Sequence, residues 1–248
     1  MKEWIIGRNP VYEVLRARRR QVFRLQVAQG AEEKGRLAEI IDLAARAKVK
    51  VERVPRQVID SRGENPQGVA LETGEYPYSD LRSILKLAES HQEPPFVLIL
   101  DTLQNPQNFG TLIRTAEAAG MHGVLIPFRR TASVTPAVVH ASAGATEHLL
   151  VAQGNLAQMI ETLKEAGAWV IGLEGGPEAQ PAAQVRLAGP LALVVGNEGE
   201  GMRSLVRRSC DVLMALPMRG QVDSLNAAVA GSIAIYLALQ ARQKTARV

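Results

Sequence analysis

The sequence predicts an α/β fold in which helices cover both faces of a mainly parallel sheet. Short apolar runs, each the length of a buried strand, alternate with helical segments along residues 96–248. This order is typical of parallel sheets, whose neighbouring strands need a crossover connection. Apolar residues make up 46% and charged residues 22%, which suits a chain with a full core. The single cysteine, Cys210, excludes a disulfide framework and a cysteine-built zinc site.

The first 75 residues are predicted to form a small α/β domain, because helical and alternating patterns succeed one another within a short length. Apolar residues at helical spacing predict helices at 9–19 and 32–47. Strand patterns are found at 22–28, 49–54 and 68–71, with a turn at 58–61. Glycine and proline then punctuate the chain, which predicts a linker at 76–95 around a short helix at 79–90.

The remaining residues, 96–248, are predicted to form the larger domain, since strand and helix patterns alternate to its end. Buried strands are expected at 96–100, 123–127, 149–152, 169–173, 191–195 and 212–216. Helices are expected at 108–119, 136–142, 155–166, 204–209 and 224–241.

Three glycine- and amide-rich segments follow three of these strands. They are Asn105–Arg114, Gly196–Met202 and Leu216–Asn226. In open α/β sheets, ligands bind just beyond the carboxyl ends of the strands. The sequence therefore predicts that the three segments share one pocket.

The residue types in these segments restrict the ligand. Asn108 and Ser224 are predicted N-caps, which leave unpaired helix amides near the pocket. The second segment carries Glu198 and Glu200 among its glycines, and two carboxylates would repel a phosphate. A cationic ligand, or one held by backbone amides, suits it better. The missing phosphate-loop lysine argues against a nucleoside-triphosphate enzyme.

Basic residues are clustered, although the formal net charge is only +4 and the pI about 9.4. The clusters are Arg16–Arg20, with Arg8 in the same region, then Arg129–Arg130, and Arg203 with Arg207 and Arg208. Each alone is compatible with a solvated surface. Together they favour phosphate contacts, because arginine grips phosphate oxygens bidentately.

Other features of the sequence indicate neither a metal site nor a membrane-spanning segment. The four histidines lack metal-ligand spacing, and they are His91, His122, His140 and His148. No long apolar run exists outside the alanine-rich C-terminal helix, and the N-terminus lacks the apolar core of a signal peptide. A cytoplasmic protein is expected.

In their order and spacing, the three segments resemble the motifs of the SpoU family of RNA ribose 2′-O-methyltransferases, also called the TrmH family. The resemblance covers about residues 96–240, and Ala143–Glu147 also fits the family. Near the N-terminus, Ile6–Val11 and Gln67–Ala70 resemble the ribosomal-protein-like RNA-binding domain of the RlmB branch. That branch methylates a guanosine ribose of 23S rRNA.

The resemblance implies a fold, a cofactor and a set of site residues. The larger domain would be a methyltransferase domain with a C-terminal deep trefoil knot, a rare feature that the sequence pattern alone does not reveal. It would bind S-adenosyl-L-methionine and form a homodimer through the knotted region and the last helix. The implied cofactor-binding residues are Gly196, Leu216, Met218 and Leu225. The implied catalytic residues are Asn108, Arg114, Glu198, Ser224 and Asn226. RNA contacts are expected from Arg8, Arg18, Arg19 and Arg20.

The implied reaction is transfer of the sulfonium methyl group to a ribose 2′-hydroxyl. In the family the arginine at position 114 is often assigned as the base, but arginine holds its proton above a pKa of about 12. Arg114 is therefore expected to stabilise the developing alkoxide or to orient a substrate phosphate. Two alternatives are a tRNA ribose methyltransferase and a non-catalytic RNA-binding or ribosome-assembly protein. The complete polar set argues against the second.

Overall fold

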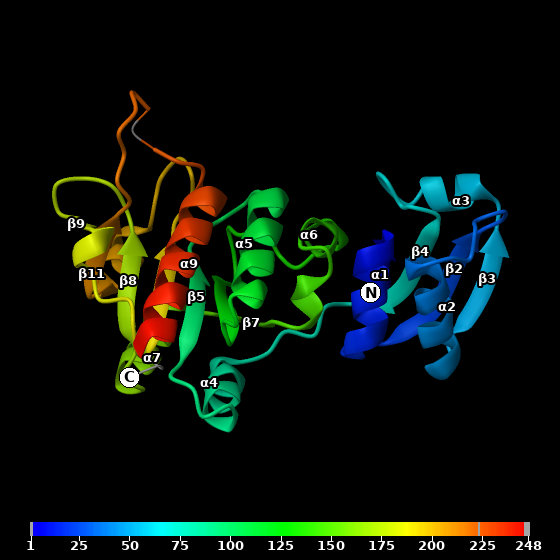
Figure 1. Cartoon of the computed structure of the whole chain (residues 1–248), viewed down its shortest axis with the longest axis horizontal. Coiled ribbons are helices and arrows are strands. Elements are labelled where there is room, and N and C mark those ends of the chain that lie inside the picture. The colour runs from blue at the N-terminus through cyan, green and yellow to red at the C-terminus, as the bar shows by residue number, and fades with distance from the viewer. Residues whose placement is uncertain (1, 223, 246–248) are drawn as a thin grey trace. The chain divides into compact units, whose positions relative to one another are not determined.

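The computed structural model describes residues 2–222 and 224–245, and the chain divides into two compact units (Figure 1). The first unit joins the residues up to Pro77 with Ser133–His148. The second joins Tyr78–Ala132 with the residues from Leu149 onward. The chain therefore passes between the units three times. This differs from the single linker predicted at 76–95, because the helix in that segment packs into the core of the second unit.

The first unit is built on a four-stranded sheet of order β1-β4-β2-β3. Its strands are β1 (Lys2–Ile6), β2 (Val22–Ala28), β3 (Lys50–Val54) and β4 (Val69–Gly74). Only β2 and β3 run parallel, while β4 is antiparallel to both its neighbours. The sequence analysis missed β1, because only its last two residues are buried and its partner β4 lies far along the chain.

Three helices complete this part of the unit: α1 (Arg8–Ala17), α2 (Arg36–Arg46) and α3 (Arg56–Asp60). The first two contact each other and bury the apolar residues that helical spacing had marked, including Val14, Leu37 and Ile40. Ile59 of α3 packs with Ile6 and Ala70 in a second cluster. The predicted turn at 58–61 is thus the end of a short helix.

A later segment of the chain, with α6 (Pro136–Ala141) and the 3₁₀ turn η1 (Ala145–Glu147), completes the first unit. Its central contact is a fully buried ion pair between Arg20 and Glu147, whose side chains are both 0% exposed. The Arg20 Nε lies 3.1 Å from each Glu147 carboxylate oxygen, and its Nη1 lies 3.0 Å from Glu3. Arg20 thus holds residues from three distant parts of the sequence together.

Other contacts reinforce this packing. The Tyr76 hydroxyl donates to the Thr146 carbonyl oxygen at 3.0 Å, and burial raises the pKa of Tyr76 to about 12. Gly144 has φ +89°, and a Cβ there would lie 2.7 Å from the Glu13 side chain. Only glycine fits this position, both for its backbone conformation and for its close neighbour.

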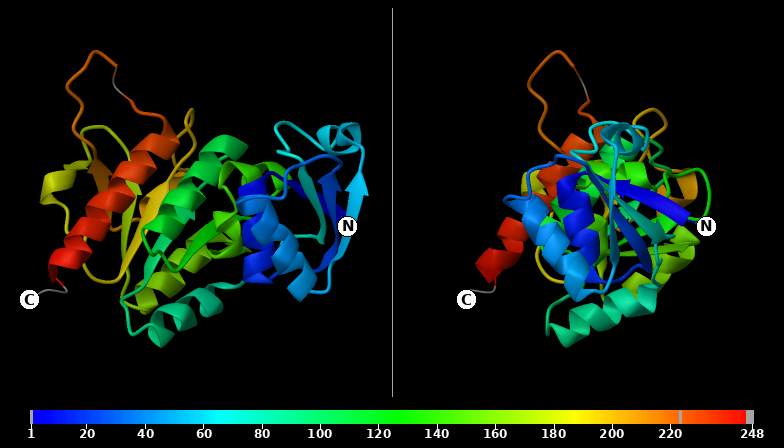
Figure 2. Two further views of the ribbon diagram at one scale, coloured as in Figure 1. Left: turned by 45° about the vertical axis from the view of Figure 1, so that its right-hand side comes forward. Right: turned by 90° about the vertical axis from the view of Figure 1, so that its right-hand side faces the viewer.

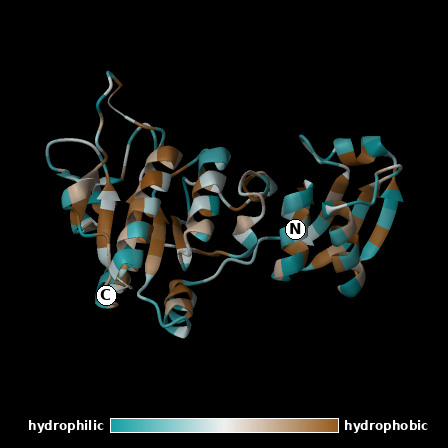
Figure 3. Cartoon of the chain, in the orientation of Figure 1, coloured by the Kyte–Doolittle hydropathy of each residue, from teal (hydrophilic) through white to brown (hydrophobic). Residues whose placement is uncertain are grey.

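The second unit contains a seven-stranded, wholly parallel sheet of order β7-β6-β5-β10-β8-β11-β9. Its strands are β5 (Phe96–Leu100), β6 (Gly123–Pro127), β7 (Leu150–Gly154), β8 (Trp169–Leu173), β9 (Gln180–Pro181), β10 (Leu191–Val195) and β11 (Val212–Ala215). Every residue of β5, β6 and β10 is buried, and the apolar strands stand out in Figure 3. Buried parallel strands read as continuous apolar runs, which is why they were recognisable.

Helices cover both faces of this sheet, as predicted (Figures 1 and 2). The helices α5 (Pro106–Ala118) and α9 (Ala227–Thr245) pack together on one face. The other face carries α4 (Leu81–Ser90), α7 (Leu156–Glu165) and α8 (Ser204–Ser209), whose apolar residues share one core cluster. A 3₁₀ turn, η2 (Ala182–Gln184), precedes β10. Cys210 packs, half-buried, against that core cluster, and burial raises the pKa of its thiol to about 12. Among the described residues, no helix is long and apolar enough to cross a membrane.

The buried ion pair of the first unit should control the stability of that unit. Arg20→Ala leaves the Glu147 carboxylate buried without its main partner, and we expect it to lower the free energy of unfolding by about 3–5 kcal/mol. Denaturant unfolding measures this in a Trp169→Phe background, where Trp4 is the one remaining tryptophan and reports on the first unit. Arg18→Ala removes an exposed neighbour and should change the value by less than about 0.5 kcal/mol. Equal denaturation midpoints for the two variants would contradict the stabilising role of the Arg20–Glu147 pair.

Candidate active site

A cavity of about 250 Å³ lies at the carboxyl ends of β8, β10 and β11. This is where ligands bind in open α/β sheets. All four residues expected to bind the cofactor line it, together with Glu198 and Ser224 from the expected catalytic set. The full lining is Leu173, Glu174, Gly175, Val195, Gly196, Asn197, Glu198, Gly201, Met214, Leu216, Met218, Ser224, Leu225, Ala227 and Ala230.

The loop after β10 is closed on itself. The backbone N–H groups of Asn197 and Gly201 each donate to the other residue's carbonyl oxygen at 3.0 Å. A Cβ at Gly196 would lie 2.4 Å from the backbone carbon of Gly201. Glycine at position 196 is therefore required by the loop itself, in addition to any close approach of a ligand.

The same loop is anchored to the end of β5 by a buried carboxylate. Asp101 is fully buried and accepts hydrogen bonds from the backbone N–H and from Nε of Arg203, both at 2.7 Å. The Asn197 amide also donates to the Thr102 carbonyl oxygen at 3.0 Å. These contacts fix both ends of the loop that carries Glu198. The sequence does not reveal this pair, because the two residues lie 102 positions apart and Arg203 belongs to a basic cluster that favours phosphate contacts.

Three of the expected catalytic residues, Asn108, Glu198 and Asn226, are joined by hydrogen bonds. The side-chain amide of Asn108 donates to Oε1 of Glu198, and the amide of Asn226 donates to Oδ1 of Asn108 at 3.3 Å. Glu198 belongs both to this cluster and to the cavity lining. The cluster therefore joins the cavity to the first turns of α5 and α9.

The helix starts differ from the predicted ones. Asn105, rather than Asn108, caps α5, because its Oδ1 accepts from the N–H of Gln107 at 2.8 Å and a proline occupies the first turn. Asn226, rather than Ser224, caps α9, since its Oδ1 accepts from the N–H of Ala228 at 2.9 Å. Asparagine is at least as good a cap as serine. The shifts leave Asn108 and Ser224 available for the site.

Arg114 is not joined to this cluster. It is exposed on α5, six residues and so about 9 Å along the helix axis beyond Asn108. Within the described part of the chain its side chain makes no hydrogen bond or ion pair. Its guanidinium is therefore accessible to a substrate that reaches this helix.

The cavity has a negative character. Glu174 and Glu198 line it, and no cationic side chain stands among the described lining residues. The rest of the lining is mainly apolar, with exposed backbone at the glycines. These residues fit a ligand that combines a positive sulfonium with an apolar ring. They do not fit a polyphosphate, in agreement with the sequence analysis.

The arginine cluster expected to contact phosphate is largely engaged elsewhere. Arg203 is paired with Asp101, and Arg207 with Glu174 and Glu178. Only Arg208 of this cluster is exposed without a described ion pair.

Of the four arginines expected to contact RNA, some are engaged within the fold and others are accessible. Arg20 is buried and paired, so the expectation that it contacts RNA is not supported. Arg19 is half-buried, and its guanidinium donates to the carbonyl oxygens of Thr146 and Pro77. Arg18 is exposed at the end of α1, and Arg8 is half-buried beside Gln67. Sequence reasoning misread Arg20 because Glu147 lies 127 residues away.

Arg8 also belongs to a polar cleft of about 390 Å³ in the first unit. Lys34 and Arg56 line the cleft as well, with Glu32 as its one acidic residue among those described. Sequence reasoning did not single out Lys34 or Arg56, because they are isolated in the sequence and meet only in the fold.

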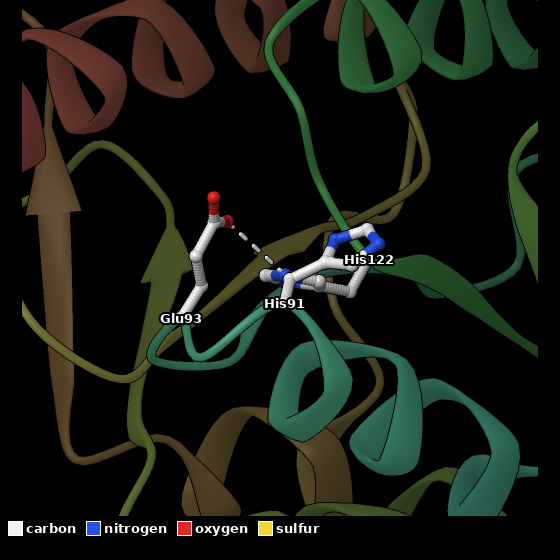
Figure 4. Close-up of side chains that lie close together, drawn as sticks. All are labelled: His91, Glu93 and His122. Atoms are coloured by element: carbon white, nitrogen blue, oxygen red, sulfur yellow. Dashed lines mark ion pairs between the residues drawn. The ribbon is translucent and has the colours of Figure 1, made fainter.

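His91, Glu93 and His122 lie together near the start of β5, contrary to the expectation of scattered histidines (Figure 4). Their ligand atoms lie within 4.8 Å of one another. However, Nδ1 of His122 accepts a hydrogen bond from the Phe96 N–H at 3.1 Å. The neutral ring therefore carries its proton on Nε2, which lies 3.4 Å from Glu93. Burial lowers the pKa of His122, so this ring stays neutral, and while Nδ1 keeps its bond to the Phe96 N–H the protonated Nε2 has no lone pair to offer a metal.

Comparisons with known proteins agree with this geometry. Residues 95–236 match the model of the SpoU rRNA methylase family, and residues 4–79 match that of the RNA 2′-O ribose methyltransferase substrate-binding domain. The putative TrmH family tRNA/rRNA methyltransferase YacO of Bacillus subtilis is 41% identical over 237 residues, 94% of each chain. The 23S rRNA (guanosine-2′-O-)-methyltransferase RlmB of Pseudomonas putida is 37% identical over 243 residues, 97% of each chain.

Solved structures share the fold. The SpoU methyltransferase AviRb of Streptomyces viridochromogenes, in complex with AdoMet, has a TM-score of 0.80 at 22% identity and covers 99% of this chain and 91% of its own. The AdoMet-bound rRNA methyltransferase of Sinorhizobium meliloti has a TM-score of 0.77 at 24% identity, covering 96% and 87%. The chain thus belongs to the SpoU family of S-adenosylmethionine-dependent RNA 2′-O-methyltransferases.

Proposed function

We propose that this chain methylates the ribose 2′-hydroxyl of a guanosine in 23S rRNA. The observation that carries the proposal is the position of Glu198, which lines the cavity and also bonds to the Asn108–Asn226 pair. The cavity proposed for the methyl donor and the polar cluster of expected catalytic residues therefore meet at Glu198. The RlmB relative, which spans 97% of both chains, supports 23S rRNA as the substrate.

We assign the cavity to S-adenosylmethionine, which supplies an electrophilic methyl group when bound. Gly196, Leu216 and Leu225 would hold it through backbone groups and apolar contacts, with Met218 at the rim. Ser224 lines the same cavity from the segment just before α9. Asn108 keeps the Glu198 carboxylate oriented, and Asn226 keeps Asn108 in place.

The role proposed for Arg114 is electrostatic. A ribose hydroxyl becomes more negative as it attacks the methyl group, and a positioned guanidinium stabilises this charge. A guanidinium has five N–H donors and no acceptor, so Arg114 serves as a donor to the alkoxide or to a neighbouring phosphate. The positioning of two reactants side by side supplies much of the remaining rate.

For the RNA itself, we propose contacts from Arg8 and Arg18, with the cleft around Lys34 and Arg56 extending the surface. These cations lie on the first unit, the part that matches the substrate-binding model. Arg19 and Arg20 serve the fold of that unit instead.

We also propose that the second unit contains the C-terminal deep trefoil knot that the family resemblance implies, and that a homodimer forms through this region and α9. Val229, Ile233 and Tyr236 are 48%, 41% and 46% exposed. They stand at helical spacing on one side of α9, whereas Ala234 and Ala238 are buried. An apolar stripe of this kind marks an interaction surface.

Modification of tRNA is the second candidate, because the name of the Bacillus subtilis relative includes both tRNA and rRNA. Mass-spectrometric mapping of ribose methylation separates the two. The protein is incubated with labelled S-adenosylmethionine and either unmodified 23S rRNA or bulk tRNA. Label confined to one guanosine of the rRNA is expected, and label in the tRNA alone would contradict the proposal.

Arg114→Ala should abolish methyl transfer in this assay, because the developing alkoxide loses its cation. Cofactor affinity, measured by calorimetry, should stay within a few-fold, since Arg114 does not line the cavity. Arg82→Ala, an exposed arginine on α4, serves as the control and should keep full activity. Full activity in Arg114→Ala would exclude the proposed role.

The double variant Arg8→Ala with Arg18→Ala should weaken RNA binding and make it less dependent on salt. Each lost phosphate contact lowers the slope of log K against log salt by about 0.7–0.9. Filter binding of an rRNA fragment between low and moderate salt measures the slope. The matched control is again Arg82→Ala, and an unchanged slope in the double variant would show that these arginines are only a solvated surface.

Ile233→Glu should convert the proposed dimer into a monomer, because a carboxylate would be buried in an apolar interface. Sedimentation velocity follows the change, with one chain having a mass of 26.8 kDa. Val222→Glu adds the same charge at another exposed apolar residue and should leave the dimer intact. A wild-type protein that sediments as a monomer at micromolar concentration would exclude the dimer.

A further inference from the structure

Glu174 lies outside the three sequence segments that define the site, yet it lines the same cavity. It follows the last residue of β8, and its backbone N–H donates to the Met214 carbonyl oxygen of β11 at 3.2 Å. Its position is therefore fixed between two strand ends. Its side chain is 28% exposed, so the carboxylate is half-buried at the cavity wall.

An arginine of α8 fixes the direction of this carboxylate. Nε of Arg207 donates to Oε1 of Glu174 at 2.8 Å, while its Nη2 donates to Glu178 at 2.5 Å. These two bonds raise the pKa of Arg207 above its ordinary value, so the guanidinium stays charged. With two carboxylates and one guanidinium, the triad of Glu174, Arg207 and Glu178 keeps a net negative charge.

Each of the two carboxylates in the cavity lining has one oxygen bonded within the described part of the chain. Glu198 is bonded to Asn108 and belongs to the catalytic cluster. In the described part of the chain, only Oε1 of Glu174 accepts a hydrogen bond, which leaves Oε2 for a ligand. The surrounding lining is mainly apolar or glycine. Glu174 therefore offers a charged acceptor to a hydrogen-bond donor on a ligand in this cavity, apart from the catalytic cluster around Glu198.

We propose that Glu174 recognises an N–H or O–H donor of the bound cofactor, and that Arg207 is the residue that positions it. S-adenosylmethionine offers three kinds of such donors, which are the ribose hydroxyls, the amino group of the adenine and the ammonium of the methionine part. The inference rests on the placement of the cofactor in this cavity, which is part of the proposed function.

Calorimetric titration with two probes tests the inference on the full-length protein. S-adenosylhomocysteine carries all three donors, whereas methylthioadenosine carries the ribose and adenine donors but no ammonium. Glu174→Ala should weaken binding of S-adenosylhomocysteine by about 10- to 100-fold, since a charge-assisted hydrogen bond is lost. An equal loss for methylthioadenosine assigns the contact to the adenosine part, whereas a loss confined to S-adenosylhomocysteine assigns it to the ammonium. Either result supports the inference.

Arg207→Ala should give a smaller loss of about three- to tenfold, because Glu174 remains but is no longer oriented. Arg208→Ala, its exposed neighbour, is the matched control and should bind as the wild type does. Thermal melting of each variant is measured in parallel. If Glu174→Ala lowers the melting temperature but leaves both affinities unchanged, Glu174 is only a structural partner of Arg207 and the inference is wrong.

A further pair of variants separates this failure from a failure of the cofactor placement. Leu225→Lys adds a cation to the cavity and should weaken S-adenosylmethionine binding whatever Glu174 does. Val222→Lys adds the same charge in the same segment but outside the lining, and should not. Unchanged binding in Leu225→Lys would overturn the placement itself. Weakened binding there, with wild-type affinities in Glu174→Ala, would overturn only the role of Glu174.

Discussion

The site depends on the attachment of one loop to the sheet through the Asp101 carboxylate. Asp101 directly follows β5, is fully buried, and accepts hydrogen bonds from both the backbone and the side chain of Arg203. A buried carboxylate is tolerated only with such partners. If the loop detached from the sheet, Asp101 would remain as a buried charge without compensation. Because Glu198 stands on this loop, its meeting with Asn108 and its place in the cavity wall both follow from the anchor.

Arginine–carboxylate pairs serve a different purpose in each unit. In the first unit the Arg20–Glu147 pair is wholly buried, and it holds a late segment of the chain against the early one. In the second unit, Arg203 and Arg207 are partly exposed: Arg203 anchors the loop after β10 through Asp101, and Arg207 holds Glu174 of the cavity lining. The cavity keeps its negative character because neither guanidinium lines it. A sulfonium cofactor needs such an arrangement, since lining cations would repel it.

Much of the second unit was predictable because its information is local. Buried parallel strands are uninterrupted apolar runs, and β5, β6, β8 and β10 have the predicted bounds. The convergence of three loops followed from the rule that strand ends in such sheets share one edge. Helix starts were less certain, because Asn105 and Asn108, or Ser224 and Asn226, are equally good caps in a sequence. In the structure the caps are Asn105 and Asn226, whose side chains accept hydrogen bonds from first-turn amides.

What the sequence could not reveal depends on partners far along the chain. The basic run ending in Arg20 looks like a phosphate-binding cluster until Glu147 is placed beside it. The segment around α4 looks like a linker because of its prolines, yet Leu81 and Ile84 are buried in the core. His91 and His122 look unrelated until the fold brings them beside Glu93. In each case the residue types were visible, but their pairing is a property of the topology.

Asn226 shows how closely folding and site are linked in this chain. Its Oδ1 accepts from the first-turn amides of α9, while its Nδ2 donates to Asn108 in the first turns of α5. One side chain therefore both starts the last helix and supports the residue that orients Glu198. The acceptor and the donor of the amide are used at once, and an ionised carboxylate of similar size has no donor to replace the second. An asparagine is thus required here by two constraints at the same time, one from helix capping and one from the polar cluster.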